Sequence, residues 1–233
     1  MSLPPPVTTR VTEGPLRDYW LARAAQHTHD TYAGVPLFKF PEDLRTYEHL
    51  LWADGTDTVI EIGTSAGGSA LWFRDRLETA RRYGRIGRRP RVISVDASHD
   101  SAREHLARAD PRWAKTIQLV DGDVRDPATA DAVAALVGDG ARCLVVEDSA
   151  HEYDTTMAAL TGFARFVPPQ GFFVVEDGCV DVEALRLDDA WPRGVLPALH
   201  DWLDTPQGRE FTVRRNLELY GISCHPEGFL QRA

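Results

Sequence analysis

Short apolar runs alternate with amphipathic stretches along most of the chain. Runs rich in β-branched residues predict buried strands at residues 59–62, 92–95, 117–120, 143–146 and 172–175. Apolar residues at helical spacing predict intervening helices at about residues 68–84, 100–108, 127–137 and 154–166. Strands that alternate with helices form parallel sheets, so the pattern predicts an α/β fold. The carboxyl ends of its strands should share one edge, where ligands bind.

The two ends of the chain carry other patterns. Residues 1 to about 15 are rich in proline and threonine, and we expect them to be mobile. Helices are predicted over 16–26 and 42–52, around an extended, proline-containing segment at 32–41. Residues 16–55 should therefore form a helical cap on a core of residues 56–233, within a single domain. A helix is predicted at 195–203, and residues 211–215 and 217–224 are predicted to pair as a closing antiparallel hairpin.

The predicted strand at 59–62 leads into a glycine-rich turn and then a helix. Glu61 lies at the end of the strand, Gly63 follows it, and Gly67 and Gly68 precede the helical pattern. Glycine allows a positive φ and a close approach of a ligand, while a carboxylate can accept hydrogen bonds from a ligand or from loop amides. The spacing differs from the dinucleotide fingerprint, which disfavours a nicotinamide-dependent oxidoreductase. It resembles the E-x-G-x-x-x-G motif of class I S-adenosylmethionine-dependent methyltransferases.

Acidic residues follow the next two predicted strands. Asp96 comes about thirty residues after the glycine turn, where a carboxylate can bind both ribose hydroxyls, although it could instead cap the next helix. The turn Asp121-Gly122-Asp123 could accept the adenine amine or could be a plain turn. We assign these residues to cofactor binding: Lys39, Glu61, Gly63, Thr64, Ser65, Gly68, Ser69, Asp96, Ser98, Gly122, Asp123 and Asp148.

Carboxylates also follow the fourth and fifth predicted strands, which should be neighbours. Asp148 follows one strand, and Glu176 and Asp177 follow the other. Carboxylates that converge at hydrogen-bonding range repel one another unless a proton or a cation intervenes. An all-oxygen site of Asp148, Glu176 and Asp177 suits Mg²⁺, and Mn²⁺ is also suitable. The alternative is that Glu147 or Glu176 is a surface residue and Asp177 caps a turn.

His151 lies three residues after Asp148 and is the candidate catalytic base. Imidazole titrates near neutral pH and can take a proton from an alcohol that a metal ion has made more acidic. His151 could otherwise be a surface or capping residue. The other histidines lack acidic company in the sequence, and we assign no role to His27, His29, His49, His99, His105, His200 and His225.

Composition and charge exclude other classes of function. A formal net charge of −9 argues against a nucleic-acid partner, because phosphate binding relies on a basic surface. No run is apolar and long enough for a membrane span, and the N-terminus lacks the pattern of a signal peptide. The 3 scattered cysteines fit a reducing compartment. We therefore expect a cytoplasmic protein without a membrane or nucleic-acid partner.

Together these motifs resemble one family of methyltransferases, which groups cephalosporin hydroxylase-type proteins with macrolide and rhamnosyl O-methyltransferases. The resemblance extends from about Tyr32 to Arg232. It rests on residues 34–44 (GVPLFKFPEDL), residues 61–70 (EIGTSAGGSA), Asp148-x-x-His151, Glu176-Asp177 and residues 225–232 (HPEGFLQR). The resemblance implies a Rossmann-like class I methyltransferase fold, with a mostly parallel seven-stranded sheet, helices on both faces and a C-terminal antiparallel hairpin.

The resemblance also implies roles for individual residues. The family's metal ligands fall on Asp148, Glu176 and Asp177, its base on His151, and its cofactor contacts on Glu61, Gly63 and Asp96. Catechol-type relatives place a lysine where His151 stands, and we expect no lysine near that site. Glu147 departs from the family pattern, in which isoleucine precedes the aspartate. If its side chain pointed inward, the ligand assignment would need revision.

We therefore predict a metal-dependent O-methyltransferase that uses S-adenosylmethionine. Its acceptor is expected to be a hydroxyl, in particular a sugar hydroxyl, of a bacterial secondary metabolite such as a glycosylated natural product. Trp20, Tyr32 and Trp191 are expected to line the acceptor pocket, and the family implies a homo-oligomer. Two alternatives are a ferrous-iron hydroxylase that uses His151 with two carboxylates, and a non-catalytic cofactor-binding partner of a tailoring enzyme.

Overall fold

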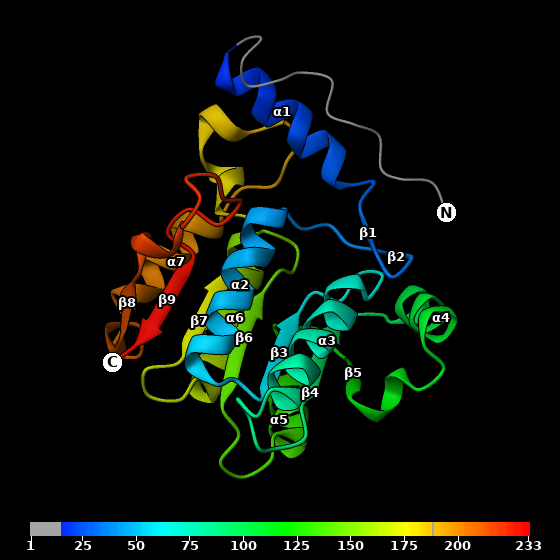
Figure 1. The fold of residues 1–233 in the computed structure, drawn as a ribbon. Coiled ribbons are helices and arrows are strands. Elements are labelled where there is room, and N and C mark those ends of the chain that lie inside the picture. The colour runs from blue at the N-terminus through cyan, green and yellow to red at the C-terminus, as the bar shows by residue number, and fades with distance from the viewer. Residues whose placement is uncertain (1–14, 188) are drawn as a thin grey trace.

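A seven-stranded sheet forms the centre of the computed structural model, which describes residues 15–187 and 189–233 (Figure 1). Its strand order is β5-β4-β3-β6-β7-β9-β8. The strands β3 to β7 are parallel, and β9 is antiparallel to both β7 and β8. The bounds are β3 (Thr58–Ile62), β4 (Arg91–Asp96), β5 (Ile117–Asp121), β6 (Cys143–Glu147), β7 (Phe172–Val175), β8 (Phe211–Val213) and β9 (Phe229–Arg232). This topology confirms the predicted fold class.

Helices cover both faces of the sheet. On one face lie α2 (Pro41–Asp54), α3 (Gly68–Arg82) and α4 (Asp100–Ala109), and on the other lie α5 (Pro127–Leu136), α6 (Tyr153–Phe163) and α7 (Val195–Leu203). Successive side chains of a strand point to opposite faces, so Val59 packs against the first group and Ile60 against the second. Short 3-10 helices are η1 (Trp113–Lys115), η2 (Ala164–Phe166), η3 (Gly178–Asp181), η4 (Glu183–Leu185), η5 (Gly208–Glu210) and η6 (Arg215–Leu217).

The remaining helix, α1 (Leu16–His27), packs away from the sheet faces. It lies beside η4, over the loops that follow β7 (Figure 1). Its buried residues Trp20 and Ala24 form a separate apolar cluster with Phe40, Cys179 and Cys224. A two-stranded hairpin of β1 (Thr31–Tyr32) and β2 (Val35–Pro36) connects α1 to the segment before α2. The division into a cap and a core stays a prediction.

The described helices are short. The longest, α3, has 15 residues, and none of the helices in the described ranges combines the length and the apolar character needed to cross a membrane. The N-terminal segment that we expected to be mobile lies, apart from Pro15, outside the described residues.

The predicted second arm of the C-terminal hairpin is wrong. The strand that pairs with β8 is β9, at Phe229–Arg232, and not residues 217–224. Part of that segment binds α2 instead, because Ser223 Oγ and the Cys224 amide donate to the Asp43 carboxylate at 2.7 and 3.0 Å. Gly228 then brings the chain against β7, since a Cβ there would lie 2.0 Å from the carbonyl oxygen of Val175.

Candidate active site

The turn after β3 lies against the loop after β6. Gly63 has a φ of 100°, and a Cβ at this position would lie 1.8 Å from the carbonyl oxygen of Asp148. A Cβ on Gly68 would lie 2.0 Å from the carbonyl oxygen of Pro36. No other residue type fits this space, so both glycines are required for the close approach of three segments.

Asp96, at the end of β4, organises this turn. The backbone amides of Thr64 and Ser65 donate to its Oδ2 at 2.9 and 3.0 Å. Its Oδ1 accepts no hydrogen bond from the described residues, and the side chain lines a cavity. Asp96 can therefore hold the loop with one oxygen and bind a ribose hydroxyl with the other.

That cavity, of about 370 Å³, lies at the carboxyl ends of β3, β4, β5 and β6. The predicted cofactor residues that line it are Gly63, Ser65, Asp96, Gly122, Asp123 and Asp148. Those outside its lining are Lys39, Glu61, Thr64, Gly68, Ser69 and Ser98. The assignment of both groups to the cofactor stays a prediction. Sequence reasoning missed the lining residues Val124, Arg125, Ser149 and Thr155, which carry no recognisable motif.

Glu61 is fully buried behind the turn. It accepts a hydrogen bond from Ser94 Oγ at 2.6 Å, and Ser94 Oγ lies 2.7 Å from Thr64 Oγ1. Thr64 Oγ1 in turn lies 2.9 Å from Nε2 of the buried His99. Burial raises the pKa of Glu61 to about 6, against the opposing charge of Lys39. Glu61 and His99, the latter unassigned from sequence, thus support the loop from beneath.

A lysine from the segment before α2 enters the acidic site. The Lys39 ammonium donates to Asp148 Oδ2 at 2.8 Å and to both carboxylate oxygens of Glu176 at 2.7 and 2.6 Å. Burial by itself lowers the pKa of Lys39, but the charges of Asp148 and Glu176 raise it well above 10.5. Lys39 is therefore a buried cation. The expectation that no lysine lies near the site is wrong.

Glu176, which follows β7, is held on several sides. Besides Lys39, Tyr47 OH donates to its Oε1 at 2.5 Å, and His225 Nε2 lies 3.8 Å from its Oε2. Burial by itself raises the pKa of Glu176, but the charges of Lys39 and His225 lower it below its usual value. Metal binding by Glu176 would require the Lys39 ammonium to move, so its role as a ligand stays a prediction.

Asp148 and Asp177 form a more open group with His151. One potential ligand atom from each lies within 4.8 Å of the others, and His151 Nε2 is 3.4 Å from Asp177 Oδ2. His151 Nδ1 is buried and has no hydrogen-bond partner among the described residues. Both His151 and Asp177 have positive φ, at 59° and 56°. Such strain in non-glycine residues concentrates at functional sites, where the surrounding structure maintains it.

The structure also places Glu147 and His225, two residues to which the sequence assigned no role in the site. Glu147, the departure from the family pattern, is buried, accepts a hydrogen bond from the Ser149 amide at 3.2 Å, and is absent from the group around His151. Its side chain points inward, the case in which the ligand assignment would need revision, so that assignment stays a prediction. His225, which we left without a role, accepts the amide hydrogen of Asp177 at 3.1 Å and so helps to position that carboxylate.

A second cavity, of about 400 Å³, shares Ser65, Asp148 and Ser149 with the first. His151 and Asp177 lie in its wall. Aromatic side chains from α1, the segment before α2 and the loop after η4 complete it: Trp20, Phe38, Phe40 and Trp191. Tyr32, also expected here, is outside the lining, because its hydroxyl donates to Asp75 Oδ2 at 2.8 Å.

Comparison with known proteins identifies the family. A family model described as Rhamnosyl O-methyltransferase/CmcI matches residues 25–233. The chain belongs to this family. It is therefore an S-adenosylmethionine-dependent O-methyltransferase, which agrees with the fold and with the two adjoining cavities.

Individual relatives are distant. The chain is 28% identical over 207 residues to a rhamnosyl O-methyltransferase of Mycobacterium tuberculosis, a match that covers 88% of this chain and 79% of that protein. The corresponding protein of Mycobacterium leprae is 26% identical over 204 residues, covering 87% and 82%. A CmcI structure described as Mg-SAM has the same fold, with a TM-score of 0.65 and 20% identity over 99% of this chain and 89% of that one.

Proposed function

We propose that the enzyme transfers the methyl group of S-adenosylmethionine to a sugar hydroxyl of a small molecule, in a metal-dependent reaction. One observation carries the proposal. Asp148 lines both cavities and is grouped with His151 and Asp177 where the two cavities adjoin. The names of the mycobacterial relatives support a sugar acceptor, and the Mg-SAM description of the CmcI structure supports magnesium. A glycosylated bacterial secondary metabolite is the acceptor class that we favour.

The first cavity is proposed to hold S-adenosylmethionine, which supplies a methyl group activated by its sulfonium. Asp96 Oδ1 would bind the ribose, while the Thr64 and Ser65 amides keep its Oδ2 in place. Gly122 and Asp123, after β5, would adjoin the adenine. The second cavity is proposed to hold the acceptor and is called the acceptor cavity below. The chain would orient the cofactor relative to this cavity, because correct alignment of the reacting atoms supplies much of the rate enhancement in transfer reactions.

The carboxylate oxygens of Asp148, Asp177 and Glu176 are suitable ligands for a hard divalent ion. Burial and the charge of Glu176 raise the pKa of Asp148 well above 3.8, despite the opposing charge of Lys39. Repulsion among these carboxylates is therefore incompletely neutralised, and another cation would relieve it. We propose Asp148 and Asp177 as ligands, with Glu176 as the third once Lys39 moves aside. Mg²⁺ is preferred and Mn²⁺ is suitable; either ion would lower the pKa of a bound hydroxyl.

His151 is the proposed base. Its ring lies in the wall of the acceptor cavity, and Asp177 Oδ2, 3.4 Å from Nε2, would stabilise the imidazolium. The acceptor hydroxyl would give its proton to His151, and its oxygen would form a bond to the methyl carbon as the carbon–sulfur bond broke. S-adenosylhomocysteine is the second product.

The test combines a chelator with a ligand variant. Asp177→Asn should lower methyl transfer to glycosylated acceptors by about 100-fold or more, because it removes the metal's charge stabilisation, and chelation should do the same. Binding of S-adenosylhomocysteine, measured by calorimetry, should persist because Asp177 lies outside the first cavity. The control is Asp131→Asn, whose side chain is 73% exposed. Full activity under chelation would eliminate the metal-dependent mechanism.

The same assays separate the alternatives. A ferrous-iron hydroxylase would consume oxygen and hydroxylate the acceptor, whereas the group around His151 has one histidine and two carboxylates instead of the usual two histidines and one carboxylate. A non-catalytic partner would bind the cofactor and yield no methylated product with any acceptor. Mass spectrometry of the acceptors distinguishes all three outcomes.

We also propose that the enzyme is a homo-oligomer. The large side chains Trp52, Tyr83 and Tyr220 are exposed on or beside the outer surfaces of α2 and α3, which supports burial against another copy. Light scattering on the purified protein tests this, and a monomer at micromolar concentration would contradict it.

A cytoplasmic location is proposed as well. Cys143, Cys179 and Cys224 are all free and buried, as expected for a protein kept in a reducing compartment. Fractionation of the source cells tests the proposal, and recovery of the protein outside the cytoplasmic fraction would overturn it.

A further inference from the structure

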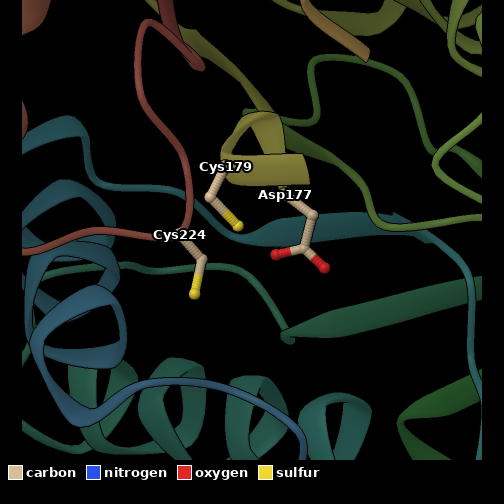
Figure 2. A group of neighbouring side chains, drawn as sticks. All are labelled: Asp177, Cys179 and Cys224. Atoms are coloured by element: carbon tan, nitrogen blue, oxygen red, sulfur yellow. The ribbon is translucent and has the colours of Figure 1, made fainter. Parts of the chain in front are cut away.

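Two cysteines lie beside Asp177 in the wall of the acceptor cavity (Figure 2). Cys179 belongs to η3, and Cys224 belongs to the segment between η6 and β9. Their exposed fractions are 2% and 9%, and both thiols are free. The two sulfur atoms and one carboxylate oxygen of Asp177 lie within 4.8 Å of one another. At this spacing, all three side chains could bind a single metal ion.

Hydrogen bonds donated by backbone amides hold the segments that carry these three side chains together. The Cys179 amide donates to the Cys224 carbonyl oxygen at 3.1 Å, and the Cys224 amide donates to Asp43 Oδ2 at 3.0 Å. The Asp177 amide donates to His225 Nδ1 at 3.1 Å. All three donors are main-chain amides, and the acceptors belong to Cys224, Asp43 and His225. A ligand would therefore meet a largely formed site.

We propose that Asp177, Cys179 and Cys224 bind a thiophilic divalent ion such as Zn²⁺. Two sulfur ligands and one carboxylate form the three-ligand set of an open tetrahedral zinc site, and the fourth position would face the acceptor cavity. Sulfur disfavours Mg²⁺, so this site differs in selectivity from the oxygen-rich group of Asp148, His151 and Asp177.

Proton release accompanies binding. A bound zinc ion deprotonates its thiol ligands, so each thiol would lose its proton to solvent as a metal–sulfur bond forms. The oxidation state of sulfur and metal does not change.

Asp177 belongs both to the thiol-containing group and to the group with Asp148 and His151. Zinc binding at the thiols should therefore affect activity. This part of the inference rests on the proposed function, in which Asp177 binds the catalytic metal and faces His151. When Asp177 binds a thiophilic ion, that carboxylate becomes unavailable to the oxygen-rich site. Low concentrations of Zn²⁺ should therefore inhibit methyl transfer even in an excess of Mg²⁺.

The binding test does not require activity. The reduced full-length protein is titrated with Cd²⁺, a spectroscopic substitute for Zn²⁺, in excess Mg²⁺, and thiolate-to-metal charge transfer is followed in the ultraviolet. The wild type and Cys143→Ser should show the band, saturating at one ion per chain, because Cys143 lies in β6 outside the cluster. Cys179→Ser and Cys224→Ser should lose most of the intensity and weaken binding more than tenfold, since even outer-shell partners contribute about that much.

Each outcome of the titration supports or overturns the proposed ion site. Absence of the band in reduced wild-type protein overturns the site, as does an undiminished band in both serine variants. Retained cofactor binding by these variants shows that they are folded. In the activity arm, Zn²⁺ should inhibit the wild type more strongly than either variant, each compared with its own rate without Zn²⁺. A normal band from a protein that never methylates any acceptor would retain the ion site and reject the proposed function.

Discussion

At the residue scale, buried charged side chains contact one another in the candidate active site. Lys39 supplies a cation between Asp148 and Glu176, and Tyr47 adds a hydrogen bond to Glu176. A carboxylate deprived of such partners would be costly to bury. Lys39 and Tyr47 therefore stabilise buried carboxylates of the candidate site, and Lys39 gives a sharp single-residue prediction.

Lys39→Met should destabilise the enzyme by about 3 to 5 kcal/mol, because it leaves a buried carboxylate without its partner. Since the ammonium no longer competes, Mg²⁺ should raise the melting temperature of the variant more than that of the wild type. Thermal unfolding with and without Mg²⁺ measures both effects. The other lysine, Lys115, is exposed, and Lys115→Met serves as the control. Equal shifts in wild type and Lys39→Met would argue against an ion beside Lys39.

Glu61→Gln should change how stability depends on pH. The folded-state pKa of Glu61 is raised from 4.5 to about 6, so its stabilising contribution is complete below pH 4.5 and is lost as the pH rises through 6. The variant should therefore gain about 2 kcal/mol relative to wild type between those values. Urea unfolding at pH 4.5 and pH 7 measures the difference. Glu78→Gln, whose native side chain is 41% exposed, is the control. A pH-independent difference for Glu61→Gln would contradict the argument.

At the element scale, the candidate site is formed by loops at the carboxyl ends of the strands. Contacts from distant elements hold these loops in place. The first turn of α2 carries Asp43, which binds the backbone and side chains of the segment at residues 223–224. That segment places Cys224 in the wall of the second cavity and His225 beside Asp177. One helix terminus thus helps to fix part of that wall.

Asp43→Ala should release that segment. The Cys224 amide would lose its acceptor in a buried setting, at a cost of about 1 to 3 kcal/mol. Hydrogen exchange at residues 223–228 should accelerate, while exchange in β3 and β4 should follow only the change in global stability. Glu42→Ala, one position earlier on α2 and more exposed, is the matched control. Unchanged protection at residues 223–228 would show that other contacts hold the segment.

At the scale of the whole molecule, two cavities lie along the edge formed by the carboxyl ends of the strands. The ends of β3 to β6 surround the first cavity, and the loops after β6 and β7 form the second together with α1. The cluster of Trp20, Ala24, Phe40, Cys179 and Cys224 is separate from the two clusters that flank the sheet. Under the proposed function, acceptor recognition could therefore change without loss of the cofactor site.

Removing residues 1–27 should raise the KM for the acceptor by about tenfold or more, because the lost aromatic and apolar contacts contribute more than 1.4 kcal/mol. Affinity for S-adenosylhomocysteine should stay close to that of the full chain, since α1 contributes nothing to the first cavity. Trp20→Ala should act in the same direction, with Trp52→Ala on α2 as its control. An equal loss of cofactor affinity would contradict this division.

Local sequence pattern predicted the elements well, because hydrophobic periodicity depends on neighbours along the chain. The predicted strands at 143–146 and 172–175 correspond to β6 (Cys143–Glu147) and β7 (Phe172–Val175). The failure at residues 217–224 has a nonlocal cause, since Ser223 binds Asp43 across a separation of 180 residues. Lys39 was misjudged for the same reason, as it reaches Asp148 across 109 residues.

The sequence by itself determined the order of strands and helices, the glycine turn at Gly63 and the acidic residues that follow the strands. Each of these depends on residue type and spacing, which are local properties of the chain. Tertiary structure alone decided that Lys39 neutralises Glu176 and that Cys224 lies beside Cys179. Such pairings form only when the sheet and its loops bring distant segments within a few ångströms, where charge and hydrogen bonding act.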